Sequence, residues 1–345
     1  MTSRIRKNVI DLAAYVPGEQ PANADVIKLN TNENPYPASP AVQEALRRIG
    51  SDALRLYPDP VCTRLRESIA RLHGCDVEQV FCGNGSDEIL ALCIRAFVET
   101  HGKIGFFDPS YSLYPVLAAI AEVGTAPLAL APDFSWPPIP DRYDVPLFFW
   151  TNPNAPTSLL CPSEPIRDFA ERSEGVVVVD EAYVDFAAAD CAALALALPN
   201  LLVTRTFSKS YSLAGIRLGY AIGNKELIAA LFKVKDAYNV NRLTQELGRA
   251  AVRDQEHMRA NTRRIVETRE RVARALRDRG FEVYPSQTNF LWLRPAQETA
   301  ETLFGRLRER GILVRHFTDP RTKEYLRVTI GTDEHMNAFL AALDA

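Results

Sequence analysis

A single lysine, Lys209, stands in a run rich in small hydroxyl residues between Thr204 and Ser212. The run follows an apolar segment, and Arg217 comes eight residues after the lysine. An amine in this setting can form a Schiff base with an aldehyde, and hydroxyls with a guanidinium can hold a dianionic phosphate. Because a lone lysine is more often a surface residue, the spacing makes Lys209 a candidate that other residues must support.

Asp180 directly follows four consecutive valines at residues 176–179, a run that predicts a buried strand. A carboxylate at the carboxyl end of a parallel strand faces the crevice in which α/β folds bind ligands. Burying that charge is costly unless a cation or a protonated nitrogen pairs with it. A simple role in capping the next turn is the alternative.

The segment from Gly83 to Glu88 (GNGSDE) follows a short apolar run and opens a predicted helix. Glycines let backbone N–H groups converge on an anion at a helix N-terminus, where the helix dipole favours negative charge. Glu88 occupies the place of the third glycine of GxGxxG, and GxxxxGK[ST] is absent, so dinucleotide and P-loop interpretations are weak. A glycine turn in which Ser86 or Asp87 caps the helix is the other interpretation.

Composition narrows the class of protein. The 345 residues are 47% hydrophobic and 24% charged, which excludes disordered and collagen-like chains. A net charge of −3 gives no general attraction for nucleic acid or acidic lipid, so a small-molecule partner is expected. No apolar stretch approaches the roughly 20 residues that span a bilayer, and no secretory leader is recognisable, so a cytoplasmic protein is expected.

The cysteines and histidines suggest no metal site. Six scattered cysteines form no CxxC pair and are expected to be reduced thiols that fill the core. The five histidines show no HExxH spacing, so metal binding is not expected.

Alternating elements must position these residues. Short apolar runs predict strands at 103–107, 146–151, 176–180, 201–206 and 218–222. Helical patterns at 62–72, 87–100 and 164–172 lie between them. This alternation predicts an α/β fold with a mainly parallel central sheet and helices on both faces.

Beyond Gly223 the pattern changes to charged helices, expected at 225–236 and 245–279. The rest predicts a compact α+β unit with strands at 281–284, 289–294, 313–316 and 325–330 and helices at 299–310 and 333–343. We therefore expect an N-terminal arm at 1–30, a large domain at 31–235 and a small C-terminal domain at 236–345.

The three motifs, in this chain order, resemble those of fold-type I pyridoxal-phosphate enzymes, specifically class I/II aminotransferases. Within these the chain is most similar to the histidinol-phosphate aminotransferases, over nearly its full length. Further matching segments are LNTNENP at 29–35, YPD at 57–59, PSY at 109–111, NPNAPT at 152–157 and LRVTIGT at 326–332. The resemblance implies the transfer of an amino group between L-histidinol phosphate and 2-oxoglutarate in histidine biosynthesis.

The resemblance also implies roles around pyridoxal 5'-phosphate. Lys209 would form the Schiff base and move the proton, and Asp180 would pair with the pyridine nitrogen. Tyr183 would bond the phenolic oxygen O3', and Tyr111 would stack on the ring. The phosphate would be held by Gly85, Ser86, Asp87, Thr206, Ser208 and Arg217, and by Tyr57 of a neighbouring subunit.

Substrate contacts are implied mainly by arginines. Arg327 matches the arginine that binds the substrate carboxylate, for which a planar guanidinium forms two parallel hydrogen bonds. Arg315 and Tyr15 are candidates for the distal phosphate, with Tyr15 coming from the partner's arm. Asn32, Glu33 and Asn289 are further candidates for this pocket. An obligate homodimer follows from the resemblance.

One position departs from the resemblance. These enzymes usually have two consecutive asparagines before Pro-Thr-Gly, the second of which bonds O3', whereas here that position is Ala155 and Ser158 replaces the glycine. Either Asn154 or Asn152 supplies the contact, or Tyr183 acts alone. Loss of one neutral hydrogen bond would cost about 1 kcal/mol, so altered cofactor electronics are expected and not loss of activity.

Other functions remain open at this point. An aromatic aminotransferase and a threonine-phosphate decarboxylase would share Lys209, Asp180 and the arginines. A cofactor-binding regulator would need a basic helix-turn-helix ahead of Asn30, for which there is too little chain. A nucleotide-binding module would not depend on Lys209.

Overall fold

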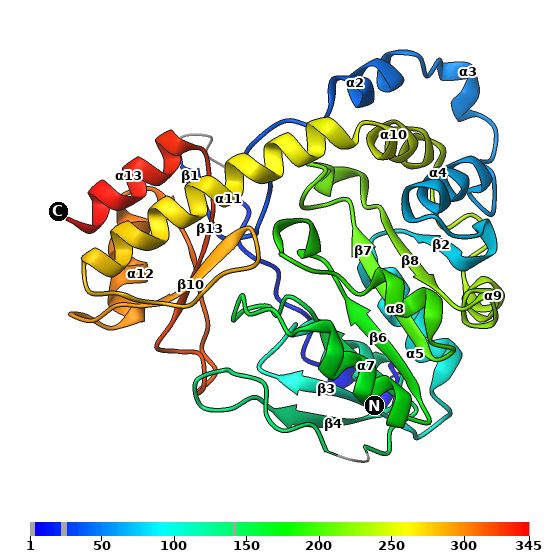
Figure 1. Ribbon diagram of the computed structural model, residues 1–345, viewed down its shortest axis with the longest axis horizontal. Coiled ribbons are helices and arrows are strands. Elements are labelled where there is room, and N and C mark those ends of the chain that lie inside the picture. Colours follow the sequence, from blue (N-terminus) through cyan, green and yellow to red (C-terminus); the bar gives the residue numbers. More distant parts are fainter. Residues whose placement is uncertain (1–3, 22–25, 141–142, 345) are drawn as a thin grey trace.

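A computed structural model describes residues 4–21, 26–140 and 143–344 of the chain (Figure 1). Its largest element is a seven-stranded sheet in the order β2-β8-β7-β6-β5-β3-β4. The strands are β2 (Val80–Gly83), β3 (Lys103–Asp108), β4 (Gly124–Ala129), β5 (Leu147–Thr151), β6 (Val176–Asp180), β7 (Leu201–Thr206) and β8 (Gly219–Gly223). Only β8 runs antiparallel to its neighbours. The predicted mainly parallel sheet is therefore confirmed.

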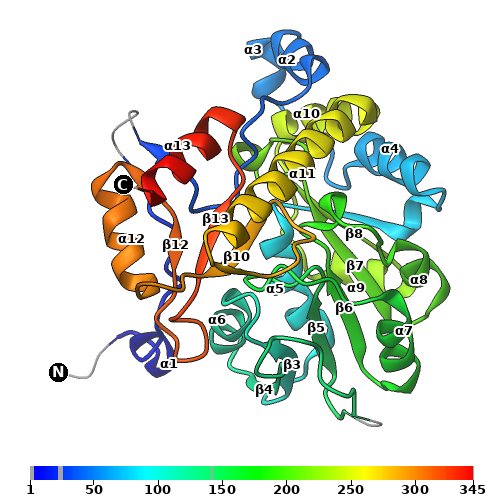
Figure 2. The ribbon, with the colours of Figure 1, turned by 60° about the vertical axis from the view of Figure 1, so that its left-hand side comes forward.

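Helices cover both faces of this sheet (Figure 2). Leu147 and Phe149 of β5 pack with α5 (Ser86–Phe97), α6 (Leu113–Ile120) and α9 (Lys225–Val234). Phe148 and Trp150 pack with α7 (Ser163–Arg172) and α8 (Ala192–Ala197). Alternate residues of a strand point to opposite faces, so a strand that is buried on both faces is apolar throughout.

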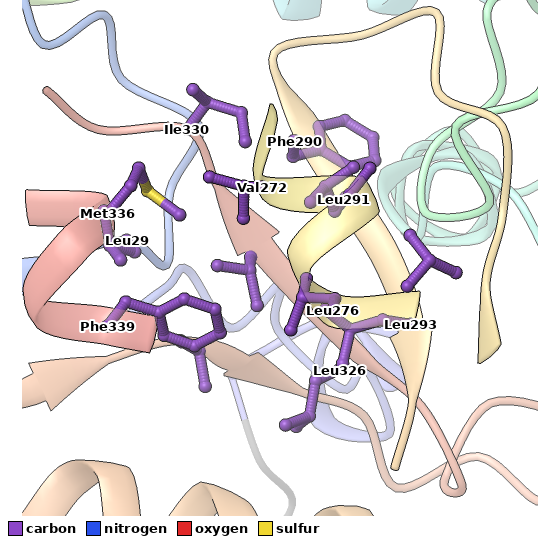
Figure 3. Close-up of a cluster of buried hydrophobic side chains, with 14 of the residues drawn as sticks. Leu29, Val272, Leu276, Phe290, Leu291, Leu293, Leu326, Ile330, Met336 and Phe339 are labelled. Atoms are coloured by element: carbon purple, nitrogen blue, oxygen red, sulfur yellow. The ribbon is translucent and has the colours of Figure 1, made fainter. Parts of the chain in front are cut away.

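A second, four-stranded sheet has the order β12-β13-β10-β9. Its strands are β9 (Glu282–Val283), β10 (Phe290–Arg294), β12 (Arg315–His316) and β13 (Leu326–Thr329). It packs against α11 (Gln255–Asp278), α12 (Ala300–Glu309) and α13 (Asp333–Leu343) around a separate apolar cluster (Figure 3). Leu29 belongs to this cluster because β1 (Ile27–Lys28) pairs in parallel with β11 (Ile312–Leu313).

The remaining helices lie near the N-terminus and beside the large sheet. They are α1 (Lys7–Ile10), α2 (Pro40–Arg47), α3 (Ser51–Leu54), α4 (Thr63–His73) and α10 (Arg242–Arg253), with short 3-10 turns at Val77–Gln79, Val184–Phe186 and Ala214–Ile216. All six cysteines are free and five are buried, as predicted. In the described ranges, no helix is both long enough and apolar enough to cross a membrane.

Two expectations were wrong in detail. The helix predicted at 245–279 is two helices, α10 and α11, which are separated at Asp254. Asp254 leaves the helical conformation, and its side chain accepts a hydrogen bond from the backbone N–H of His257 to cap α11. The strand predicted at 313–316 is divided between β11 and β12, which belong to different sheets. The division into domains at residue 236 stays a prediction.

Candidate active site

A pocket of about 290 Å³ opens at the carboxyl edge of the large sheet and is closed on its other side by the second sheet. Asp180 ends β6 and Thr206 ends β7, so both side chains reach this edge, where parallel sheets bind ligands. The pocket brings together most of the predicted site residues, namely Tyr15, Asn32, Glu33, Ser86, Asp87, Tyr111, Asp180, Tyr183, Thr206, Ser208, Lys209, Arg217, Arg315 and Arg327.

Lys209 lies in the loop after β7 and points its amine into the pocket. Nζ donates to the backbone oxygen of Thr31 over 3.2 Å and lies 5.7 Å from the centre of the Tyr183 ring. Burial, together with the positive charge of Arg327, lowers the pKa of the Lys209 amine to about 8. A larger fraction of this amine is therefore neutral and nucleophilic near neutral pH than for an exposed lysine.

Asp180 is 3% exposed, and its two carboxylate oxygens differ in their hydrogen bonding. The hydroxyl of Tyr114, from α6, donates to Oδ2 over 3.1 Å, while Oδ1 has no hydrogen-bond partner among the described residues. Burial raises the pKa of Asp180 to about 6, against the lowering effect of the Tyr114 hydrogen bond. A buried acceptor without a partner favours a ligand that brings a donor, such as a protonated ring nitrogen.

The N-terminus of α5 forms an anion cradle. Ser86 is its first residue, and Gly85 precedes it with φ of +87°, where an added Cβ would lie 2.7 Å from Nη2 of Arg217. Nη1 of Arg217 donates to Oγ of Ser208 over 3.2 Å, and Oγ1 of Thr206 donates to the same oxygen over 3.0 Å. Backbone N–H groups, two hydroxyls and a guanidinium thus converge as a phosphate requires.

Hydrogen bonds within the cradle hold the side chains of Asp87 and Arg217 in place. The carboxylate of Asp87 accepts from the hydroxyl of Tyr111 over 3.1 Å and from Nη2 of Arg217 over 3.3 Å. Tyr111 stands edge-on to Tyr114, with 5.7 Å between ring centres. These contacts fix the aromatic wall of the pocket relative to the cradle.

The second sheet contributes a pair of arginines. Arg315 and Arg327 are direct cross-strand neighbours in β12 and β13. Arg327 donates to the backbone oxygen of Asn30 over 3.1 Å, and its Nε is buried without a partner. Burial and the neighbouring charge of Arg315 lower the pKa of Arg327. A half-buried guanidinium with an unused donor is suited to receive an anionic substrate group.

The N-terminal arm lies over the pocket of its own chain. Tyr15 packs edge-on against Tyr111, with 6.2 Å between ring centres, and Arg315 donates to the backbone oxygen of Val16. Glu19 holds the arm through an ion pair with Arg308. In the single chain Tyr15 therefore lies at its own pocket, and the predicted crossing of Tyr15 to a partner's pocket stays a prediction.

Four predicted residues do not line the pocket. Gly85 shapes the cradle from behind, and Asn289 lies behind Asn32, to whose backbone oxygen it donates over 3.0 Å. Asn154 is fully buried and donates to Pro109 and Thr157. Tyr57 is 76% exposed and stacks on Tyr238, outside the pocket of its own chain.

Sequence reasoning missed two residues around Asp180: Tyr114, which lies behind the pocket, and Thr151, which lines it. Tyr114 lies in an apolar helix that predicts core packing, so nothing in its local pattern indicated its contact with Asp180. Thr151 lies opposite Asp180 in the register of β5 and β6, and its hydroxyl is 2.6 Å from that of Tyr114. The position of Thr151 at the end of an apolar strand, as for Asp180, was the available signal.

The residues fit pyridoxal phosphate. The unpartnered Oδ1 of Asp180 suits its protonated ring nitrogen, the Lys209 amine suits its aldehyde, and the cradle of α5 suits its phosphate. No group of three or more metal-ligating side chains occurs in the residues that the structure describes.

Comparisons with known proteins agree with this chemistry. The sequence profile of class I and II aminotransferases matches residues 24–343. A histidinol-phosphate aminotransferase from Chromohalobacter salexigens is 47% identical, over 98% of this chain and 97% of its own. The crystal structure of the histidinol-phosphate aminotransferase from Sinorhizobium meliloti, in complex with pyridoxal-5'-phosphate, superimposes with a TM-score of 0.88 at 25% identity, over 99% of this chain and 97% of that one.

An L-threonine-O-3-phosphate decarboxylase from Porphyromonas gingivalis has the same fold, with a TM-score of 0.80 at 23% identity, over 92% of this chain and 98% of that one. The fold alone therefore does not distinguish transamination from decarboxylation.

Proposed function

The chain belongs to the class I and II aminotransferase family, and we propose that it transfers the amino group of L-histidinol phosphate to 2-oxoglutarate, as a step of histidine biosynthesis, with pyridoxal 5'-phosphate as cofactor. The observation that supports this best is the half-buried Arg327, whose buried Nε has no partner and which lines the same pocket as Lys209. The pocket thus offers a nucleophilic amine beside a receptor for an anion, which an amino-acid or amino-phosphate substrate needs.

Each residue then has a physical task. Bound pyridoxal phosphate supplies an aldehyde and an electron-withdrawing ring that stabilises negative charge on the substrate carbon. Lys209 attaches the cofactor and, once freed, moves a proton to and from that carbon. Asp180 keeps the ring nitrogen protonated, Tyr183 donates to the phenolic oxygen, and Arg217 with Ser208 holds the phosphate.

The two substrates differ in the anion that they present. L-Glutamate brings a carboxylate next to its amino carbon, for which the fork of Arg327 is suited. Histidinol phosphate brings a phosphate, and Arg315 places a second guanidinium directly opposite Arg327. Two adjacent cations suit a dianion better than a single carboxylate. Asn32 and Glu33 complete this side of the pocket.

The test is to supply three amino donors separately to the purified protein with 2-oxoglutarate. L-Histidinol phosphate is expected to yield L-glutamate at the highest kcat/KM. Glutamate from phenylalanine alone would indicate an aromatic aminotransferase, and carbon dioxide from threonine phosphate would indicate a decarboxylase; either result overturns the proposal.

The attachment of the cofactor is tested separately. Borohydride reduction followed by peptide mass spectrometry is expected to find the cofactor on Lys209. The Lys209→Ala variant should show no cofactor attached at residue 209 after reduction, and it should have no turnover. An unmodified Lys209 in active enzyme would contradict its role.

We also propose that the protein acts in the cytoplasm as a homodimer in which Tyr57 reaches the phosphate in the partner's pocket. Tyr57 is exposed in the single chain and stacks on Tyr238, which is itself 45% exposed, so this aromatic pair is available to a partner. Sedimentation should give twice the chain mass of 38.5 kDa. Tyr57→Phe should weaken cofactor binding without changing that mass. A monomer that is fully active would refute this assembly.

A further inference from the structure

The segment from Asn152 to Ser158 gives the pocket no side-chain amide. Ala155 lines the pocket at the position where the resemblance to class I/II aminotransferases implies an asparagine. The amide of Asn152 is bonded at both ends to Cys161, and Nδ2 of Asn154 donates to Pro109 and Thr157. Neither asparagine is free to replace the missing donor, so the phenolic oxygen of the cofactor depends on another residue.

Tyr183 is the hydroxyl best placed for that task. It is 8% exposed, and its ring packs edge-on against Phe290 with 5.1 Å between centres. Nδ2 of Asn32 donates to its hydroxyl oxygen over 2.8 Å. Because that oxygen is used as an acceptor, the hydroxyl proton remains to be donated, and it has no acceptor within the described part of the chain.

The orientation of Asn32 is itself determined by hydrogen bonds. The hydroxyl of Thr329 accepts from the backbone N–H of Asn32 over 3.0 Å and donates to its Oδ1, also over 3.0 Å. Since Oδ1 is thus an acceptor from Thr329, Nδ2 must face Tyr183. Nδ2 of Asn289 holds the backbone of Asn32, whose φ is +57°. The three hydrogen bonds therefore run in one direction: the backbone N–H of Asn32 donates to Thr329, Thr329 donates to Oδ1 of Asn32, and Nδ2 of Asn32 donates to Tyr183.

This chain of hydrogen bonds also joins the two sides of the pocket. Thr329 and Arg327 lie two residues apart on β13, so their side chains share one face of the strand. Tyr183 follows β6 of the large sheet. Strand β13, which carries Arg327, is thus linked to Tyr183 through the hydrogen bonds of Asn32.

We propose that Asn32 is a positioning residue that directs the hydroxyl proton of Tyr183 at the phenolic oxygen of the cofactor and so compensates for Ala155. It acts through Tyr183 and not as a substrate ligand. This inference rests on the proposed function, since it needs pyridoxal phosphate in the pocket.

The experiment compares Asn32→Ala and Thr329→Val with wild type. Cofactor affinity is measured by titrating apoprotein with pyridoxal phosphate, and the pH midpoint of the visible absorbance is measured on the holoenzyme. Asn32→Ala should weaken affinity about fivefold, the value of one neutral hydrogen bond. The midpoint should move to higher pH, because a donor to the deprotonated phenolic oxygen is lost. Thr329→Val should change both in the same direction.

Two further variants separate positioning from general loss of stability. Asn32→Ala with Ala155→Asn should recover both affinity and midpoint, because an amide returns at the position that related enzymes use. Asn261→Ala is the matched control, since Asn261 is also buried but donates to Pro37 outside the pocket; it should leave the midpoint unchanged.

The outcomes distinguish this inference from the proposed function. If wild type binds the cofactor and uses histidinol phosphate while Asn32→Ala and Thr329→Val keep the wild-type midpoint, only the role of Asn32 is refuted. An equal shift in Asn261→Ala would also refute it. If wild-type protein binds no pyridoxal phosphate, the proposed function itself fails.

Discussion

The hydroxyl of Tyr114 donates to Oδ2 of Asp180 over 3.1 Å and leaves Oδ1 of the same carboxylate directed at the pocket. Tyr114 is fully buried, its ring stacks on Phe149, and its hydroxyl is hydrogen-bonded to that of Thr151. The carboxylate is therefore held in one rotamer before any ligand arrives. Preorganisation of this kind saves the ordering cost at binding.

Tyr114→Phe removes that hydrogen bond and keeps the ring. We expect affinity for pyridoxal phosphate to fall about tenfold, because hydrogen bonds to charged groups are worth about 1.5–3 kcal/mol and part of that is recovered by relaxation. Titration of the apoprotein with pyridoxal phosphate measures this affinity. Tyr143→Phe, which removes a partly buried hydrogen bond to the backbone oxygen of Ala126 outside the pocket, is the control. Equal affinities for wild type and Tyr114→Phe would contradict the role of Tyr114.

Asp180 makes cofactor binding depend on pH. Burial raises its pKa to about 6 from 3.8, so in apoprotein it takes up a proton as the pH falls through about 6 and loses the charge that pairs with a protonated ring nitrogen. Affinity should therefore decrease below about pH 6. The cofactor itself also changes protonation with pH, so its affinity is measured for both wild type and Asp180→Asn. The ratio of the wild-type affinity to the Asp180→Asn affinity should fall as the pH is lowered. A constant ratio from pH 5 to 8 would count against this role.

The same shift affects the stability of the apoprotein. Between about pH 4 and 6 the folded chain holds a proton on Asp180 that the unfolded chain has released. The folded state binds more protons in this window, so the contribution of Asp180 to the free energy of unfolding falls as the pH rises. Denaturant unfolding across this window should show the free energy of unfolding of wild type falling, relative to that of Asp180→Asn, as the pH rises.

Arg327→Gln tests the anion receptor. We expect kcat/KM for L-glutamate to fall about ten- to a hundredfold, as for loss of a charge-assisted hydrogen bond, and Arg327→Lys to recover only part because the planar fork is lost. The positive charge of Arg327 lowers the pKa of Lys209, so its removal should also move that pKa upward. Arg294→Gln, on an exposed strand residue paired with Glu282, should behave as wild type. Unchanged kinetics in Arg327→Gln would reject the assignment.

Gly85→Ala tests the phosphate cradle. An added Cβ would lie 2.7 Å from Nη2 of Arg217 at a φ that side chains rarely adopt. Affinity for pyridoxal phosphate should fall by more than affinity for pyridoxal, which lacks the phosphate. Gly305→Ala, with open space around it in α12, should change neither. Equal losses for both ligands would place the damage elsewhere than at the phosphate.

Local patterns predicted most of the elements. The strands at 176–180 and 201–206 have the predicted bounds, because continuous apolar runs between turns require burial on both faces. The break between α10 and α11 at Asp254 was missed because the helical spacing of apolar residues continues on both sides of Asp254. Only the hydrogen bond from the backbone N–H of His257 to the Asp254 side chain reveals the break. Strand β4, at Gly124–Ala129, was also missed, because it lies at the sheet edge and none of its residues is buried.

The sequence by itself determined the chemistry of this protein: an amine at 209, an acid at the end of β6, a glycine-shaped helix start at 85 and a set of arginines. These follow from residue types and short spacings. Tertiary structure alone decided which groups meet. Tyr114 reaches Asp180 across 66 residues and Asn32 reaches Thr329 across 297, and the arm lies over its own pocket. Such contacts depend on strand order and on the packing of one sheet against the other, which no local pattern contains.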